Sequence, residues 1–124
     1  MPHLKASPHA AVLNMVSVGA FIFAPMLSMY ASMKAALMSF TRSMAAEFCH
    51  HASGSTRWPP GPVDTDMMRS NPQEAIDGMV NGTLMRRLAS ADEMIGAALL
   101  FLTSDAGSYL TGQVIMVDGG GTPR

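Results

Sequence analysis

Three side chains in the first third of the chain have the types and the spacing of a proton-transfer site. Tyr30 and Lys34 are four residues apart, and Ser17 lies thirteen positions before the tyrosine. On a helix, a four-residue spacing places Tyr30 and Lys34 on one face, within reach of a common ligand. The lysine ammonium group would favour the phenolate form of the tyrosine, which would make the tyrosine a better proton shuttle at neutral pH.

Ser17 would reach the same place from a different segment. Its hydroxyl could hold a substrate oxygen while negative charge develops on that oxygen. A tyrosine and a lysine at this spacing also occur often by chance, and the alternative interpretation is an ordinary helix surface. The elements around the three residues therefore matter as much as the residues themselves.

The first half of the chain predicts a strand, a loop and a long helix. The apolar run Ala11–Val16 predicts a strand that ends beside Ser17. A loop through Pro25 then leads to a helix from about Ser28 to His50, because this stretch contains no Gly or Pro. Ser28 is the expected N-cap of the helix.

The second half of the chain predicts two further strands and a helix between them. A weak strand is expected at Thr56–Pro59, where few β-branched residues precede a proline. Ser90 and Glu93 have the spacing of a capping box, and the helix that they begin should run to about Thr103. The last strand is expected at Gln113–Val117. About three strands with flanking helices predict an α/β fold with a parallel sheet.

Four segments, in this order, resemble motifs of the short-chain dehydrogenase/reductase family. They are the apolar run 11–18 with its serine, the Tyr30–Lys34 pair, the turn Pro60–Thr65 and the terminal segment Tyr109–Gly120. The resemblance covers only the C-terminal half of the family's domain. It implies that residues 1–124 form a single partial domain, the C-terminal part of a Rossmann-like doubly wound parallel sheet whose N-terminal half is missing.

The resemblance also implies NAD(P)-dependent oxidation of an alcohol or reduction of a carbonyl compound. In the family, the tyrosine is the acid/base, the lysine assists it and hydrogen-bonds the nicotinamide ribose, and the serine orients the carbonyl group. These catalytic roles carry over to Tyr30, Lys34 and Ser17. Residues 62–88 would form a substrate lid, whose methionines would supply either an adaptable apolar wall or simply a helix core.

The same resemblance implies that the Pro-Gly turn lies against the nicotinamide of the cofactor. A glycine in such a turn lets the backbone approach a flat ring closely, although a plain strand-to-helix turn is the alternative interpretation. The expected cofactor contacts are Tyr30, Lys34, Pro60, Gly61, Val63 and Thr65.

Several features that are usual in the family are absent from the sequence. No Gly-rich turn follows a strand, so the chain lacks the cradle for the cofactor pyrophosphate and the residue that selects NAD or NADP. The asparagine that commonly completes the catalytic tetrad is absent too. The chain therefore resembles a fragment or a truncated gene product. The alternative hypothesis is a catalytically inactive remnant that acts at most as an oligomerisation or interaction module.

The composition disfavours several other classes of function. A formal net charge of −1, with 14% charged residues, provides no basic field for nucleic acid. The single cysteine, Cys49, excludes an internal disulfide and a cysteine-based zinc cluster, and it favours a reducing, cytoplasmic compartment. The four histidines lack the paired spacing of a metal site, so no metal is expected.

The charge-free stretch Ala6–Met33 is long enough for a secretory signal or a membrane span. Polar and helix-breaking residues interrupt it, so we expect no membrane partner. The expected partners are a small-molecule carbonyl or alcohol substrate and, by resemblance, further copies of the chain in a homo-oligomer. An open edge at the first strand and uncovered apolar helix faces would also promote self-association.

Overall fold

The computed structural model describes residues 2–7, 10–22, 25–51, 54–103 and 105–122. Within these residues, the regular structure consists of two strands, β1 and β2, five helices, α1 to α5, and three short 3-10 turns, η1 to η3. Their bounds are α1 Pro2–Ala6, β1 Ala11–Met15, η1 Val18–Ala20, α2 Ser28–Phe48, η2 Cys49–His51, β2 Gly54–Trp58, α3 Asp66–Arg69, α4 Gln73–Asn81, α5 Ala91–Thr103 and η3 Asp105–Gly107.

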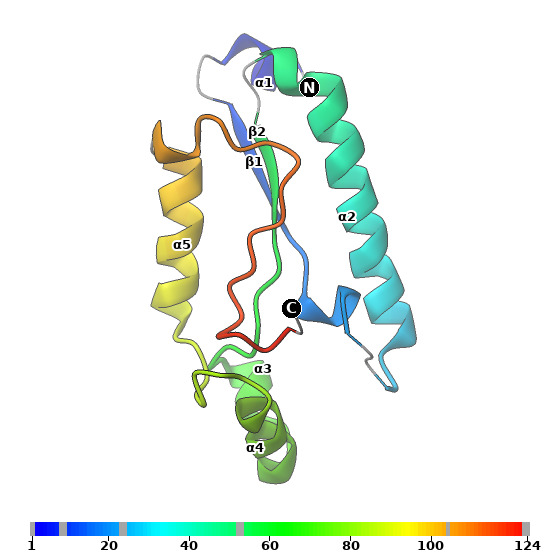
Figure 1. The fold of residues 1–124 in the computed structure, drawn as a ribbon, viewed down its shortest axis with the longest axis vertical. Coiled ribbons are helices and arrows are strands. Elements are labelled where there is room, and N and C mark those ends of the chain that lie inside the picture. The colour runs from blue at the N-terminus through cyan, green and yellow to red at the C-terminus, as the bar shows by residue number, and fades with distance from the viewer. Residues whose placement is uncertain (1, 8–9, 23–24, 52–53, 104, 123–124) are drawn as a thin grey trace.

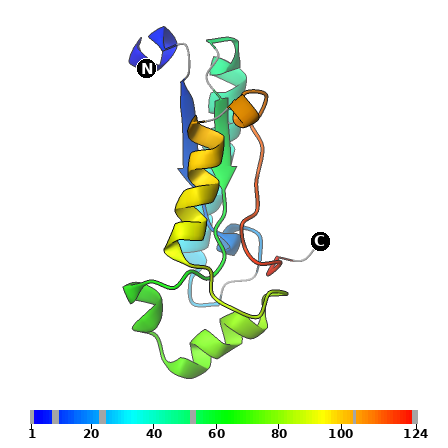
Figure 2. The ribbon, with the colours of Figure 1, turned by 90° about the vertical axis from the view of Figure 1, so that its left-hand side faces the viewer.

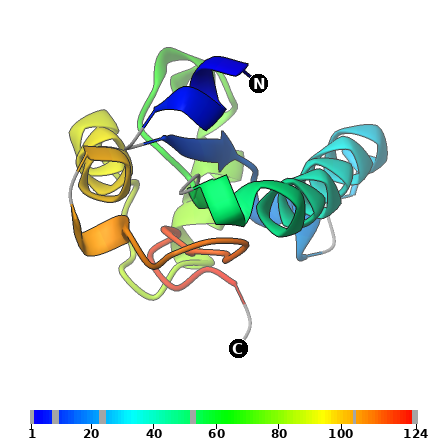
Figure 3. The ribbon, with the colours of Figure 1, turned by 90° about the horizontal axis from the view of Figure 1, so that it is seen from above.

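The two strands form a parallel sheet between two long helices. β1 and β2 pair in register from Ala11 with Gly54 to Met15 with Trp58. Helices α2 and α5 lie on opposite sides of the strands (Figures 1 and 3). The short helices α3 and α4 extend beyond the carboxyl end of β2 (Figure 1). The α/β fold class with a parallel sheet and flanking helices is thus confirmed.

The expected third strand at Gln113–Val117 is wrong as a regular strand, although the segment runs beside β2 (Figure 2). It forms only isolated parallel bridges, Arg57 with Val114 and Pro60 with Val117. Between them, the Val117 N–H donates to the Pro59 carbonyl at 3.3 Å. Pro59 has no N–H with which to continue the ladder on its own side. The proline therefore divides the third strand into two bridges.

The start of α2 also differs from the expectation. Ser28 is the first residue of the helix and not its N-cap, and Leu27 in the cap position makes no side-chain capping bond. The helix is instead held on the sheet by a partly buried polar contact, in which Asn14 Nδ2 donates to Thr41 Oγ1 at 3.0 Å. Thr41 is fully buried and donates in turn to the Leu37 carbonyl at 2.7 Å. Tertiary contacts therefore fix α2 where a local cap was expected.

The core is small for a chain of this length. Among the described residues, large apolar side chains are exposed on both long helices, including Met29, Met33 and Phe40 on α2 and Ile95, Leu99 and Leu100 on α5. The buried apolar residues in the described part of the chain include Ala10, Val16, Ala45, Trp58, Pro59 and Met94. Apolar helix faces do meet solvent, as expected, while self-association through them stays a prediction.

The capping box at the start of α5 is confirmed. The Ser90 N–H donates to Glu93 Oε2 at 2.8 Å, and the Glu93 N–H donates to Ser90 Oγ at 3.1 Å. The Arg87 guanidinium adds two parallel hydrogen bonds to the Glu93 carboxylate, at 2.8 and 2.7 Å. One carboxylate therefore joins the N-terminus of α5 to the segment before it.

Strong acid should weaken this junction, because it protonates the Glu93 carboxylate that makes these hydrogen bonds. The hydrogen bonds from Arg87, followed by that from the Ser90 N–H, lower the pKa of Glu93 from 4.5 to about 2. Because the pKa is lower in the folded state, the stability that Glu93 contributes is present above pH 4.5 and is lost as the pH falls towards 2. Urea unfolding followed across this range should show a smaller pH dependence in Glu93→Gln than in the parent.

Glu74→Gln is the matched control, because Glu74 is also a carboxylate in the first turn of a helix, α4, and is exposed. It should keep the pH dependence of the parent chain. Equal pH dependence in the parent and in Glu93→Gln would contradict the assignment of this acid-sensitive step to Glu93.

Candidate active site

The carboxyl ends of the two strands bring the serine segment and the Pro-Gly turn together. Ser17 and Pro60 each lie two residues beyond the last residue of their strand, Met15 of β1 and Trp58 of β2. The Val18 N–H donates to the Pro60 carbonyl at 3.3 Å and links the two segments directly. In open parallel sheets this edge is where ligands bind.

Ser17 and Tyr30 approach each other around Gly19. Ser17 Oγ accepts the N–H of Gly19 at 3.1 Å and so caps η1. A Cβ placed on Gly19 would lie 3.5 Å from Ser17 Oγ and 3.7 Å from Tyr30 Cε1. The serine hydroxyl and the edge of the tyrosine ring therefore share one small space. Sequence reasoning did not single out Gly19, whose signal would have been a glycine two residues after the serine.

Tyr30 and Lys34 lie at the start of α2, on the side of the helix that meets the end of β1. Lys34 Nζ donates to the Met15 carbonyl at 2.9 Å and lies 5.7 Å from the centroid of the Tyr30 ring. The tyrosine is 44% exposed, so a ligand can reach it from solvent. The structure thus brings together the three residues, Ser17, Tyr30 and Lys34, that the sequence marked as candidates.

The Pro-Gly turn lies against the terminal segment. The Gly61 N–H donates to the Val117 carbonyl at 3.0 Å. A Cβ on Gly61 would come within 2.6 Å of Asp118 Cα and 2.9 Å of its carbonyl oxygen. Only glycine fits so close to another backbone. The close approach that requires this glycine is thus to the protein's own backbone.

Val63 and Thr65, the other two candidates in this turn, lie further along the chain and already have structural partners. Val63 forms a parallel bridge with Ala89. Thr65 Oγ1 accepts the N–H of Met68 at 3.2 Å and caps α3. Their contact with a cofactor stays a prediction.

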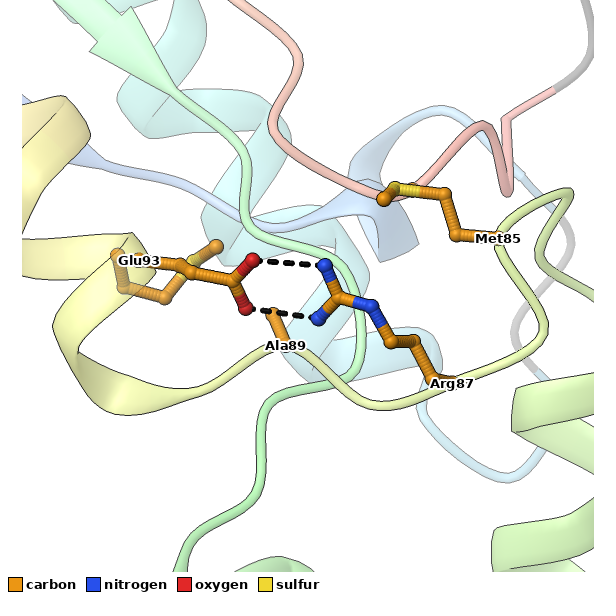
Figure 4. A pocket seen from close by; sticks show the side chains of 6 residues that line it. Met85, Arg87, Ala89 and Glu93 are labelled. Carbon is orange, nitrogen blue, oxygen red and sulfur yellow. Dashed lines mark hydrogen bonds and ion pairs between the residues drawn. The ribbon is translucent and has the colours of Figure 1, made fainter.

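A small pocket lies beside Ala89, where the segment 62–88 returns to the sheet (Figure 4). In Figure 4 the paired Arg87 and Glu93 side chains cross one side of it, while Met85 and Ala89 lie around them. Its lining residues are Met85, Arg87, Ala89, Glu93, Met94 and Gly119. Because Ser17, Tyr30 and Lys34 are not among them, the candidate active site is the open strand edge and not this pocket.

No group of three or more His, Cys, Asp or Glu side chains in the described part of the chain is arranged to hold a metal ion. None of the helices described is long and apolar enough to cross a membrane.

Comparisons with known proteins agree with this geometry. A family model described as enoyl-(acyl carrier protein) reductase matches residues 1–122. Dehydrogenase/reductase SDR family member 6 of Rattus norvegicus is 32% identical, over 97% of this chain and 51% of its own length. The chain belongs to the short-chain dehydrogenase/reductase family. It spans about half the length of the curated relatives that it matches.

Solved structures also match the fold of this chain. A 3-oxoacyl-[acyl-carrier protein] reductase from Brucella melitensis superposes with a TM-score of 0.88 at 31% identity, over 96% of this chain and 44% of that one. A blue fluorescent protein from a metagenomic library, in complex with NADPH, superposes with a TM-score of 0.85 at 26% identity, over 95% of this chain and 48% of that one. The family thus includes proteins that bind a nicotinamide cofactor.

Proposed function

We propose that this chain is the catalytic half of an NAD(P)-dependent oxidoreductase that transfers hydride between nicotinamide and a carbonyl or secondary alcohol. The observation that carries the proposal is the meeting of Ser17, Tyr30 and Lys34 at the carboxyl end of β1, beside the Pro60–Gly61 turn. Tyr30 is the acid/base of this proposal. Family membership supports the reaction class.

The chain's own groups fit the nicotinamide half of such a cofactor. Lys34 has three N–H donors, and the Met15 carbonyl takes one of them. The remaining donors suit the two hydroxyls of a ribose. The Pro60–Gly61 turn presents a backbone with no side chain at Gly61, on which a flat ring can lie. Val63 and Thr65 would extend this contact.

Each of the three side chains has a separate task in carbonyl reduction. A bound reduced nicotinamide supplies the hydride that the carbonyl carbon accepts. Since Ser17 Oγ accepts a hydrogen bond from Gly19, its own proton is free to be donated to the carbonyl oxygen. The Tyr30 hydroxyl gives its proton to that oxygen as the alcohol forms, and the Lys34 ammonium stabilises the phenolate that remains.

The proposal extends to the rest of the chain. Residues 62–88, whose Met67 and Met85 are exposed, would act as the substrate lid, and the exposed apolar residues of α2 and α5 would pack in a homo-oligomer. The exposed Cys49 suits a cytoplasmic location. The alternative is an inactive remnant that only oligomerises, favoured by the uncovered apolar surface of the two long helices.

Cofactor binding can be measured through the single tryptophan of the chain. Trp58 is buried two residues before Pro60, and reduced nicotinamide absorbs light at the wavelengths where tryptophan emits. Titration with NADH or NADPH should therefore quench the emission of Trp58, and Lys34→Met should weaken binding about tenfold by removing charge-assisted hydrogen bonds to the ribose.

Lys5→Met is the matched control, because Lys5 is the only other lysine and is exposed on α1. It should bind as the parent does. Adenosine diphosphate, which lacks the nicotinamide, controls for quenching by the nucleotide alone. Absence of quenching by both reduced cofactors would argue for the inactive remnant.

A further inference from the structure

The turn at residues 118–122 lies between two segments that the reaction would use. We propose that Asp118 is a positioning residue. Its carboxylate holds the turn 118–122, called the bracket below, in one conformation. In that conformation the bracket contacts the Pro60–Gly61 turn on one side and the end of the lid segment, residues 83–85, on the other. The proposal rests on the proposed function only in that it takes these two segments as the cofactor turn and the lid. It goes beyond that function because it gives a task to a residue that touches neither cofactor nor substrate.

The Asp118 carboxylate holds the bracket together from inside. Its Oδ1 accepts the Gly120 N–H at 3.0 Å, and its Oδ2 accepts both the Thr122 N–H at 2.8 Å and the Thr122 hydroxyl. Burial acts to raise the pKa of Asp118, yet the hydrogen bonds from Thr122 and Gly120 keep that pKa below its ordinary value. The carboxylate is therefore ionised, and its hydrogen bonds are of the strong, charge-assisted kind.

One side of the bracket supports the Pro-Gly turn. The Gly61 N–H donates to the Val117 carbonyl at 3.0 Å, and Gly61 leaves no room for a Cβ against the Asp118 backbone. The Pro60 carbonyl in turn accepts the Val18 N–H at 3.3 Å. The bracket is therefore connected to the serine segment through the Pro60–Gly61 turn.

The other side of the bracket supports the end of the lid segment. The Met85 N–H donates to the Gly119 carbonyl at 3.1 Å. Gly119 and Gly120 have φ of +61° and +77°, a region that favours glycine, and a Cβ on Gly120 would lie 2.8 Å from Leu84 Cδ1. The positive φ angles favour glycine at both positions, and at Gly120 the contact with Leu84 leaves no room for a side chain. Two segments far apart in the sequence are thus held on one short turn.

Weakening the hydrogen bonds of Asp118 should make the Pro60–Gly61 turn and residues 83–85 more mobile, while Ser17, Tyr30 and Lys34 keep their direct contacts. In Asp118→Asn the charged acceptor is lost, so the amides of Gly61 and Met85 should exchange hydrogen about tenfold faster, as expected for losing a hydrogen bond to a charged group. The Val16 amide, which donates to the Trp58 carbonyl at 3.0 Å in the strand region, should keep its protection.

Two further variants make the exchange experiment decisive. Thr122→Val removes one donor to Asp118 near the end of the chain and should give a smaller effect at the same two amides. Asp105→Asn makes the same chemical change at an exposed position of η3 and should leave both amides as in the parent. Unchanged exchange at Gly61 and Met85 in Asp118→Asn and Thr122→Val would overturn the proposal, and so would an equal increase at Val16.

Cofactor binding separates a positioning role from a merely structural one. Asp118→Asn should raise the dissociation constant for NADPH, measured by quenching of Trp58, and raise KM for the cofactor about tenfold while kcat changes less. Equal losses in kcat and in kcat/KM would contradict positioning of the cofactor turn. If the parent chain binds no NADPH, the proposed function fails, while the exchange data still decide whether the bracket exists.

Discussion

Replacing Tyr30 with phenylalanine is expected to slow carbonyl reduction by about 10²- to 10⁴-fold, the usual contribution of a positioned acid or base. The substitution removes one hydroxyl from a side chain that is 44% exposed, so the fold should survive. The rate would be followed by consumption of NADPH at saturating carbonyl substrate. Quenching of Trp58 by NADPH should persist in the variant, since the Lys34 ammonium and the Pro60–Gly61 turn remain.

The matched control for this experiment is Tyr109→Phe. Tyr109 is the only other tyrosine and is completely exposed, so its hydroxyl should be dispensable. Equal rates in the parent and in Tyr30→Phe would contradict the role of Tyr30. No rate in the parent would support the alternative, an inactive remnant, and the homo-oligomer should then be tested by sedimentation.

Replacing Arg57 with methionine is expected to destabilise the fold by about 3 kcal/mol, because buried carbonyl oxygens would lose a charged donor. Arg57 is only 2% exposed, and its guanidinium donates to the carbonyls of Met38 at 3.1 Å, of Gln113 at 3.3 Å and of Gly112. These bonds join the middle of α2 to the terminal segment. In the described part of the chain, Arg57 has no carboxylate within salt-bridge distance.

The midpoint of urea unfolding measures this loss. Burial, followed by repulsion from Arg42, lowers the pKa of Arg57. Arg42→Met is the control, since Arg42 is exposed on α2 and its loss would relieve the repulsion. A midpoint for Arg57→Met at or above that of the parent would show that apolar packing replaces the guanidinium fully.

The burial of Arg57 could not be predicted from the sequence. A weak strand was expected at Thr56–Pro59, and nothing in the sequence marked Arg57 for burial, since arginine is mostly exposed in folded proteins. Its partners are backbone carbonyls, which every residue has and which therefore leave no trace in the sequence. Residues 52 and 53 lie outside the described residues, while β2 itself begins at Gly54, two residues earlier than expected.

The interruption of the third strand could have been predicted from the sequence. Pro59 was recognised as a proline at the end of a weak strand, and its missing N–H necessarily breaks the ladder on one side of β2. The apolar pattern of Gln113–Val117 suits a strand, but regular pairing also depends on the N–H groups of the neighbouring strand. Ser28 failed as an N-cap for a different reason: side-chain capping depends on the backbone angles of the preceding loop, which tertiary contacts set.

Local spacing in the sequence by itself determined the parts of this protein that depend on a single element. The four-residue interval between Tyr30 and Lys34 decides that they share a helix face, and the Ser90–Glu93 capping box decides where α5 begins. The order of the motifs determined the family. These properties follow from helix geometry and from hydrogen bonds between near neighbours, so they can be read without knowing the fold.

Only the tertiary structure decided which elements meet. The approach of Ser17 to Tyr30 around Gly19 and the contact of Gly61 with Asp118 join separate segments. The physical reason is that parallel pairing of β1 and β2 brings the carboxyl ends of both strands to one edge, where their following loops must pack on each other. Such contacts depend on register and on close packing through space, and neither property is encoded in the spacing of residues along the chain.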